Sequence, residues 1–207
     1  MATSKSRRKD LPENRRACIL KAARCVFARQ GYAATIVDDI AGQAGIAKGT
    51  LYLYFKSKED IFFAALVEDA RRMEQLTRER IQSVDSWKDK LAAYVSVRME
   101  YLETHQDFLR IYLAEIRGMM VCGMRMHSDL QQVMRESEGQ LAQVFAAAMA
   151  RHEVRSVDPN LAASTVADLT RGLMERRLLG WSCTITPPAD AEFALEVLYC
   201  ALAAGRN

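Results

Sequence analysis

The residues best suited to chemistry lie in one short stretch, residues 31–61, and their types favour contact with a polyanion. A lysine can donate to guanine or phosphate, a threonine can meet a thymine, and a glycine lets the backbone approach a groove. Tyrosine hydroxyls, a second lysine and the free N–H groups at a helix start suit phosphates. The predicted DNA contacts are Thr35, Lys48, Gly49, Thr50, Tyr52, Tyr54 and Lys58.

Two short helices that meet at a glycine would position these side chains. A helix-turn-helix needs a small residue where the helices cross, a turn residue that tolerates positive φ, and an apolar residue just after it. Ala41, Gly45 and Ile46 have these properties at the required spacing. A capping box of Thr35 with Asp38 is expected to start the first of the two helices. Inward packing is predicted for Ile40, Ile46, Leu51 and Phe55.

This stretch resembles the DNA-binding signature of the TetR family over about residues 13–62. The matching residues are Thr35, Ile40, Ala41, Ala44, Gly45, Ile46, Gly49, Leu51, Tyr52, Tyr54, Phe55, Ser57, Lys58 and Glu59. Ala47 departs from the serine or threonine that is usual in the family, so the second helix lacks a side-chain N-cap. Asp38 and Asp39 suit the positive end of a helix, and we assign them no base contact.

Charge is distributed unevenly along the chain. Residues 1–60 carry 12 Lys and Arg against 6 Asp and Glu, whereas the rest carry 17 against 20. A basic first part suits a polyanionic partner. We expect a basic flexible arm at residues 1–12, which either reaches phosphates or a minor groove or remains a solvated tail. A helix-turn-helix domain at 13–57 and a helical domain at 58–207 are expected to follow.

The remaining pattern predicts an all-α fold. Apolar residues recur at three- and four-residue spacing, and the 207 residues include only 4 prolines and 10 glycines. Further helix starts are indicated by Ser57 with Asp60, Ser86 with Asp89, Asp158 before Pro159, and Pro187 with Pro188. Nine helices are expected, near residues 12–30, 36–44, 47–54, 58–82, 87–104, 107–122, 128–151, 159–180 and 189–204.

The family resemblance implies a homodimer formed through the last two long helices, and a ligand cavity among the central ones. Small and apolar residues at 162–173 and 193–201 fit either a dimer interface or an intramolecular core. The expected effector is small and apolar or amphipathic, since methionine-rich walls adapt to such ligands. Candidate lining residues are Met99, Leu102, Phe108, Tyr112, Glu115, Met119, Met120, Met134 and Trp181, although ordinary core would show the same pattern.

Arg98 and Glu115 lie in otherwise apolar stripes. A buried charge needs a partner, so the two side chains are expected to pair with each other, to hold a polar group of the ligand, or to reach solvent.

Several function classes are disfavoured by the sequence. It contains no G-x-S-x-G, H-E-x-x-H, P-loop or dinucleotide motif, so an enzyme is not expected, and neither is a cofactor or metal site. No apolar run is long enough to span a membrane, which predicts a cytoplasmic, nucleoid-associated protein. We expect a ligand-released repressor that binds a palindromic operator in double-stranded DNA as a dimer. An activator, or an architectural or cell-division DNA-binding protein without a ligand, remains the alternative.

Overall fold

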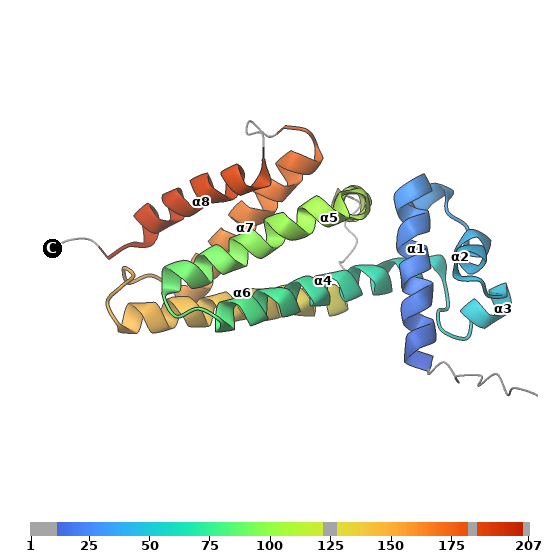
Figure 1. Ribbon diagram of the computed structural model, residues 1–207, viewed down its shortest axis with the longest axis horizontal. Helices are drawn as coiled ribbons and strands as arrows, with labels where there is room; N and C mark the ends of the chain where they lie inside the picture. Colours follow the sequence, from blue (N-terminus) through green and yellow to red (C-terminus); the bar gives the residue numbers. More distant parts are fainter. Residues whose placement is uncertain (1–11, 122–127, 182–185, 205–207) are drawn as a thin grey trace, which may run out of the picture. The chain divides into compact units, whose positions relative to one another are not determined.

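The computed structural model describes residues 12–121, 128–181 and 186–204 (Figure 1). Within these ranges the chain is all-α, as predicted, with eight helices and no strand. It divides into two compact units, residues 1–65 and residues 66–207, here called the N-terminal and C-terminal units. The division falls inside α4 (Lys58–Gln82), so one continuous helix contributes residues to both units.

The N-terminal unit contains α1 (Pro12–Ala34), α2 (Val37–Ala44), α3 (Lys48–Leu51) and the first residues of α4. Apolar residues from all four helices form its core: Ile19, Leu20, Ala23, Val26, Phe27, Ile40, Leu51, Ile61 and Phe62 are fully buried. The rings of Phe27 and Phe62 meet edge to face, with centroids 5.2 Å apart. This contact fixes the start of α4 against α1, because aromatic pairs prefer such geometry.

Gly31 interrupts α1 where the sequence predicts that the helix ends. Its φ of 80° and ψ of 166° are non-helical, and three more residues, to Ala34, follow before the helix stops. A side chain at positive φ would be strained, so this bend requires glycine.

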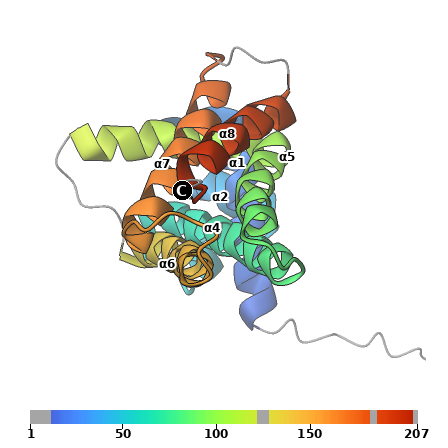
Figure 2. The ribbon, with the colours of Figure 1, turned by 90° about the vertical axis from the view of Figure 1, so that its left-hand side faces the viewer.

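The C-terminal unit contains the rest of α4 with α5 (Trp87–Val121), α6 (Ser128–Ala150), α7 (Pro159–Leu178) and α8 (Pro187–Leu202). Within it α7 packs along α6, and α5 lies against both α7 and α8 (Figures 1 and 2). Leu91, Leu102, Leu141, Phe145 and Ala163 are among the fully buried residues of the shared core. No helix in the described ranges has an apolar stretch long enough to cross a bilayer.

The nine expected helices become eight because α5 is one element with a kink. His105 has φ −130° and ψ 23°, which are non-helical values, and it lies between the predicted helices 87–104 and 107–122. The sequence therefore locates the interruption correctly, while the chain on either side keeps helical hydrogen bonding. The predicted helix at 47–54 is also shorter, since α3 ends at Leu51 and continues as a turn.

Most predicted helix starts are confirmed. Ser57 accepts from the Asp60 N–H at 3.0 Å, Ser86 accepts from the Asp89 N–H at 3.1 Å, and Asp158 caps α7. The capping box of Thr35 with Asp38 is wrong. Thr35 is buried and donates its hydroxyl to the Gly31 carbonyl at 2.6 Å, because the break in α1 leaves that carbonyl without a helical donor. Asp39 instead accepts a hydrogen bond from the Ile36 N–H at 3.4 Å. Helix α2 starts at Val37, one residue after the predicted start.

Candidate nucleic-acid interface and ligand site

The turn between α2 and α3 has the geometry of a helix-turn-helix. Gly45 takes left-handed values, φ 66° and ψ 36°, and the Ile46 N–H donates to the Ala41 carbonyl at 3.0 Å. This bond satisfies a terminal carbonyl of α2 in the manner of a Schellman cap. Ala41 is buried and Ile46 half-buried. The turn therefore holds α3 at a fixed angle to α2.

One side of α3 faces the core and the other faces solvent. Leu51 and Phe55 are buried, as predicted. Of the proposed DNA contacts on this helix and the following turn, Lys48, Gly49 and Tyr52 are exposed, while Thr50 and Tyr54 are half-buried. These five residues are therefore brought together at one short element.

Leu53 belongs to this surface but is absent from the predicted contacts. Its side chain is 83% exposed, the largest value among the large apolar side chains that the structure describes. The signal that could have found it is its spacing. Residue 53 follows Gly49 by four positions, and residues four apart share a helix face.

Lys48 forms an exposed ion pair with Asp38. Its Nζ lies 3.0 Å from Oδ1 and 3.1 Å from Oδ2 of that carboxylate, and both side chains are about half exposed. The hydrogen bond to Asp38, followed by the charge attraction, raises the pKa of Lys48 above its ordinary value. Asp38 thus pairs with the first residue of α3 instead of capping α2.

Thr35 and Lys58 point into the N-terminal unit. The Lys58 Nζ donates to the carbonyl oxygens of Tyr32 at 2.8 Å and Thr35 at 2.9 Å, and lies 4.5 Å from the Tyr32 ring centroid. A lysine with these partners holds the end of α1 and the connection to α2. In this geometry its ammonium is directed at protein carbonyls.

The candidate ligand residues are placed differently from one another. Met99 and Leu102 are buried in the core and Met134 is half-buried, whereas Trp181 is 64% exposed. The side chains of Phe108, Tyr112, Glu115, Met119 and Met120 lie outside the described part of the structure. A recess of about 90 Å³ is lined by Ser96, Met99, Glu100, Glu103, Pro187, Pro188 and Ala191. That volume is small beside the roughly 300–1,000 Å³ of typical ligand pockets.

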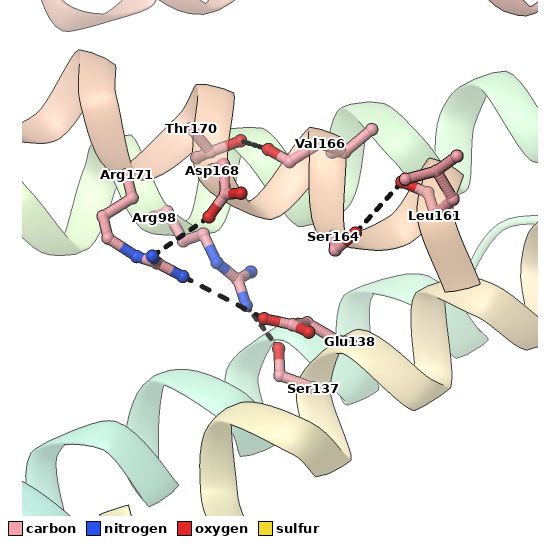
Figure 3. Close-up of polar contacts among 9 residues, drawn as sticks. All are labelled: Arg98, Ser137, Glu138, Leu161, Ser164, Val166, Asp168, Thr170 and Arg171. Atoms are coloured by element: carbon pink, nitrogen blue, oxygen red, sulfur yellow. Dashed lines mark hydrogen bonds and ion pairs between the residues drawn. The ribbon is translucent and has the colours of Figure 1, made fainter. Parts of the chain in front are cut away.

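Arg98 is buried at the junction of three helices, so the solvent alternative is wrong for it. Its guanidinium donates to the Thr77 hydroxyl at 3.2 Å and to the Tyr94 carbonyl at 2.9 Å. It also donates to the Ser137 hydroxyl at 2.5 Å (Figure 3). The guanidinium also stacks over the Tyr94 ring, with its Cζ atom 3.4 Å from the ring centroid. Burial lowers the pKa of Arg98, while the charge of the buried Glu74 acts in the opposite direction. The cation therefore joins α4, α5 and α6.

The structure separates core from surface on α7 and α8. Ala162, Ala163 and Val166 of α7, and Ala194 and Leu198 of α8, are buried within the C-terminal unit. A second set of residues faces solvent at four-residue spacing: Leu161, Thr165, Leu169, Phe193, Val197 and Ala201. The first set belongs to the core of the C-terminal unit. The second set, which is exposed on the two helices, is here called the α7/α8 face.

The remaining sequence predictions concern metal binding and the basic arm. In the described ranges no group of three or more His, Cys, Asp or Glu side chains is arranged to hold a metal ion. The predicted basic arm at residues 1–12 lies outside the described residues, except for Pro12 at the start of α1.

Comparison with known proteins agrees with the geometry of the N-terminal unit. Residues 19–65 match the family of bacterial regulatory proteins named tetR. The helix-turn-helix of the N-terminal unit is thus similar to the N-terminal domain of that family. Over 99 residues it is 36% identical to the fatty acid metabolism regulator protein of Bacillus subtilis, covering 48% of this chain and 51% of that protein. Over 70 residues it is 37% identical to the HTH-type transcriptional repressor AcnR of Corynebacterium glutamicum, covering 34% and 37%.

The chain thus spans about half the length or less of these curated relatives. Solved structures extend the likeness beyond the N-terminal unit to the fold of most of the chain. FadR of Bacillus subtilis, solved in complex with stearoyl-CoA, matches with a TM-score of 0.77 at 24% identity, over 89% of this chain and 98% of that one. The ketosteroid regulator KstR2 of Mycobacterium tuberculosis matches with a TM-score of 0.65 at 21% identity, over 92% and 96%. At these identities the likeness concerns the fold.

Proposed function

We propose that this chain is a DNA-binding transcriptional regulator that recognises a palindromic operator as a homodimer and is released by a small effector. The observation that carries the proposal is the exposed face of α3, held by the Gly45 turn and the buried Leu51 and Phe55. The named relatives are regulators, which favours this activity over an enzyme or an architectural protein. Such a protein would act at the chromosome in the cytoplasm.

The homodimer is proposed to form through the α7/α8 face. Phe193 and Val197 are 66% and 47% exposed and lie one helical turn apart. Burial of such side chains against a second copy would stabilise the dimer by roughly 25 cal/mol for each Å² of apolar surface removed from water. A twofold axis would also present two α3 helices to half-sites about 34–36 Å apart.

Effector control is proposed to act through α4. Asp69 and Thr77 of this helix accept hydrogen bonds from Tyr101 and Arg98 of α5, whereas Lys58 at its start donates to Tyr32 and Thr35. A ligand that displaced α4 in the C-terminal unit would move Lys58 and so disturb the base of the helix-turn-helix. A coupling free energy of about 1–3 kcal/mol would weaken operator binding about 5- to 150-fold.

The effector is proposed to be amphipathic, and a long-chain acyl-CoA is the first candidate. FadR of Bacillus subtilis was solved with stearoyl-CoA, and the sequence relative from that species is named for fatty acid metabolism. We propose residues 13–57 as the DNA-binding domain and residues 58–207 as the effector and dimerisation domain.

The decisive test of DNA recognition is selection of duplexes from a random library by the purified full chain. An inverted repeat with half-sites one helical turn apart is the expected product. Failure to enrich any sequence would overturn the proposed function. Stearoyl-CoA added to the selected complex is expected to weaken binding at least about fivefold. Unchanged affinity with this compound would remove acyl-CoA as the effector while leaving operator binding intact.

Dimerisation is tested separately by Phe193→Glu, which would bring carboxylates together across the twofold axis. The expected result is a monomer in sedimentation velocity with lost operator affinity. Leu76→Glu is the matched control, since Leu76 is 44% exposed on α4 and outside the α7/α8 face. A Phe193→Glu protein that still sediments as a dimer would exclude this face as the interface.

A further inference from the structure

Leu53 lies in the turn that directly follows α3, the helix that is proposed to enter DNA. A single exposed leucine is common on protein surfaces and carries no meaning alone. Here the backbone fixes its position, because the Leu53 N–H donates to the Thr50 carbonyl at 3.2 Å and the Tyr54 N–H donates to the Leu51 carbonyl at 3.0 Å. The backbone around Leu53 is thus a hydrogen-bonded turn.

The direction of Leu53 follows from the burial of its neighbours. Leu53 faces away from the core that buries its neighbours Leu51 and Phe55. Leu51 and Phe55 are buried at 0% and 5% exposure, in contrast to the 83% of Leu53. Gly49 is exposed, and nothing lies within 4 Å of the position where its Cβ would be. A groove wall can therefore approach the backbone beside Leu53.

We infer that Leu53 is a specificity-determining residue that selects a thymine in each half-site by packing on its C5-methyl group. This inference rests on the proposed function and assigns a base contact to one residue of the exposed surface at α3. The C5-methyl is the apolar group that the major groove presents; the other base edges offer hydrogen-bond donors and acceptors. A leucine packed against a polar base edge would displace the water bound there without replacing the hydrogen bonds of that water. Contact of Leu53 with a polar base edge is therefore disfavoured.

The surroundings of Leu53 favour DNA over a protein partner. Lys48 and Lys56 are exposed, Tyr52 presents a hydroxyl, and Thr50 is half-buried beside them. A protein interface of ordinary size needs a broad patch with an apolar centre. A lone leucine flanked by basic and hydroxyl groups matches a groove that offers phosphates and one methyl group.

The experiment removes only the methyl group. The full-length chain first selects its preferred duplex from a random library, and each thymine of that duplex is then replaced in turn by uracil. Loss of a methyl where Leu53 packs is expected to weaken binding about fourfold for one half-site and about fifteenfold for both, as measured by fluorescence anisotropy. Leu53→Ala is expected to bind both duplexes equally.

Leu76→Ala is the matched control, because it removes the same atoms from an exposed leucine of the C-terminal unit and should keep the full uracil effect. The inference is overturned if no uracil replacement weakens the wild type, if Leu53→Ala responds as strongly as the wild type, or if the selected half-site lacks thymine. Tight binding without a methyl effect leaves the proposed function standing. Failure to select any duplex overturns both.

Discussion

The two units are stabilised in different ways. The N-terminal unit consists of α1, the short helices α2 and α3, and the start of α4, and its geometry is set by single residues: Gly31 and Gly45 at positive φ, and Lys58 on carbonyl groups. The C-terminal unit consists of long helices, with a buried cation, Arg98, bonded across three of them. Local backbone conformation thus sets the turns of the first unit, whereas the second depends on contacts between its long helices.

This difference explains why the DNA-binding site can be recognised from the sequence and the ligand site and dimer interface cannot. A helix-turn-helix has a sequence signature because its turn, crossing point and exposed helix lie within about twenty residues. A ligand site or dimer face in a helical bundle is assembled from helices far apart in the chain, and its residues look like any amphipathic stripe. The contrast predicts that substitutions in the two units will differ in size and in what they disturb.

The largest effect is expected in the C-terminal unit, from Arg98→Met. Loss of the guanidinium leaves the hydroxyls of Thr77 and Ser137 buried without their donor, and it removes a cation that attracts the buried carboxylate of Glu74. Breaking a buried charge network of this kind costs about 3–5 kcal/mol in the free energy of unfolding. Urea unfolding followed by tryptophan fluorescence measures it in this unit, because both tryptophans, Trp87 and Trp181, belong to it.

Arg171→Met is the matched control for that experiment. Arg171 ion-pairs with Asp168 at 3.0 Å and with Glu138 at 4.0 Å (Figure 3). Its side chain is 43% exposed. Exposed pairs contribute about 0–1 kcal/mol, so this variant should remain near wild type. Equal effects of the two substitutions would contradict the distinction between the buried cation and the exposed one.

A smaller effect is expected in the N-terminal unit, from Lys58→Met. Its ammonium donates to two carbonyl groups within 2.9 Å, and hydrogen bonds to charged groups are worth about 1.5–3 kcal/mol. Hydrogen exchange of residues 32–44 should therefore become faster, while the salt dependence of DNA binding keeps its slope. Mass spectrometry measures the exchange rate. Binding affinity at several salt concentrations measures the salt slope.

Lys56→Met is the control, since Lys56 is exposed two residues earlier. This substitution should leave exchange unchanged. Replacing a lysine that neutralises a phosphate would reduce the salt slope by about one. If Lys58→Met lowers the slope and leaves exchange unchanged, the phosphate contact predicted from the sequence is right and the structural role argued from the geometry is wrong.

The smallest effect is expected at two glycines only three residues apart. Gly45 has φ 66°, so Gly45→Ala should destabilise the unit by about 1–2 kcal/mol even though a Cβ there meets no atom. Gly42 lies within α2, and Gly42→Ala should stabilise it by up to about 1 kcal/mol through helix propensity. Hydrogen exchange of α2 measures both. Effects of the same sign would show that local backbone conformation does not control this turn.

Sequence reasoning is most successful where one residue type has one physical consequence. Gly45, Ser86 and Asp158 are predicted to turn or cap the chain, and the backbone bonds agree. The capping box at Thr35 is wrong because the break at Gly31 exposes a carbonyl that competes for the hydroxyl. Leu53 is absent from the predicted contacts because an apolar side chain gives no polar signal for DNA, and its direction depends on how α3 is seated.

The sequence by itself determined the helical fold, the helix-turn-helix and its turn, and the basic character of residues 1–60. These follow from periodicity, capping and charge, which act between residues close in the chain. The tertiary structure decided that Lys58 points at carbonyl groups, that Arg98 is buried, and that Phe193 is exposed while Ala194 is core. Each of these depends on which helix packs on which, and an amphipathic pattern leaves that choice open.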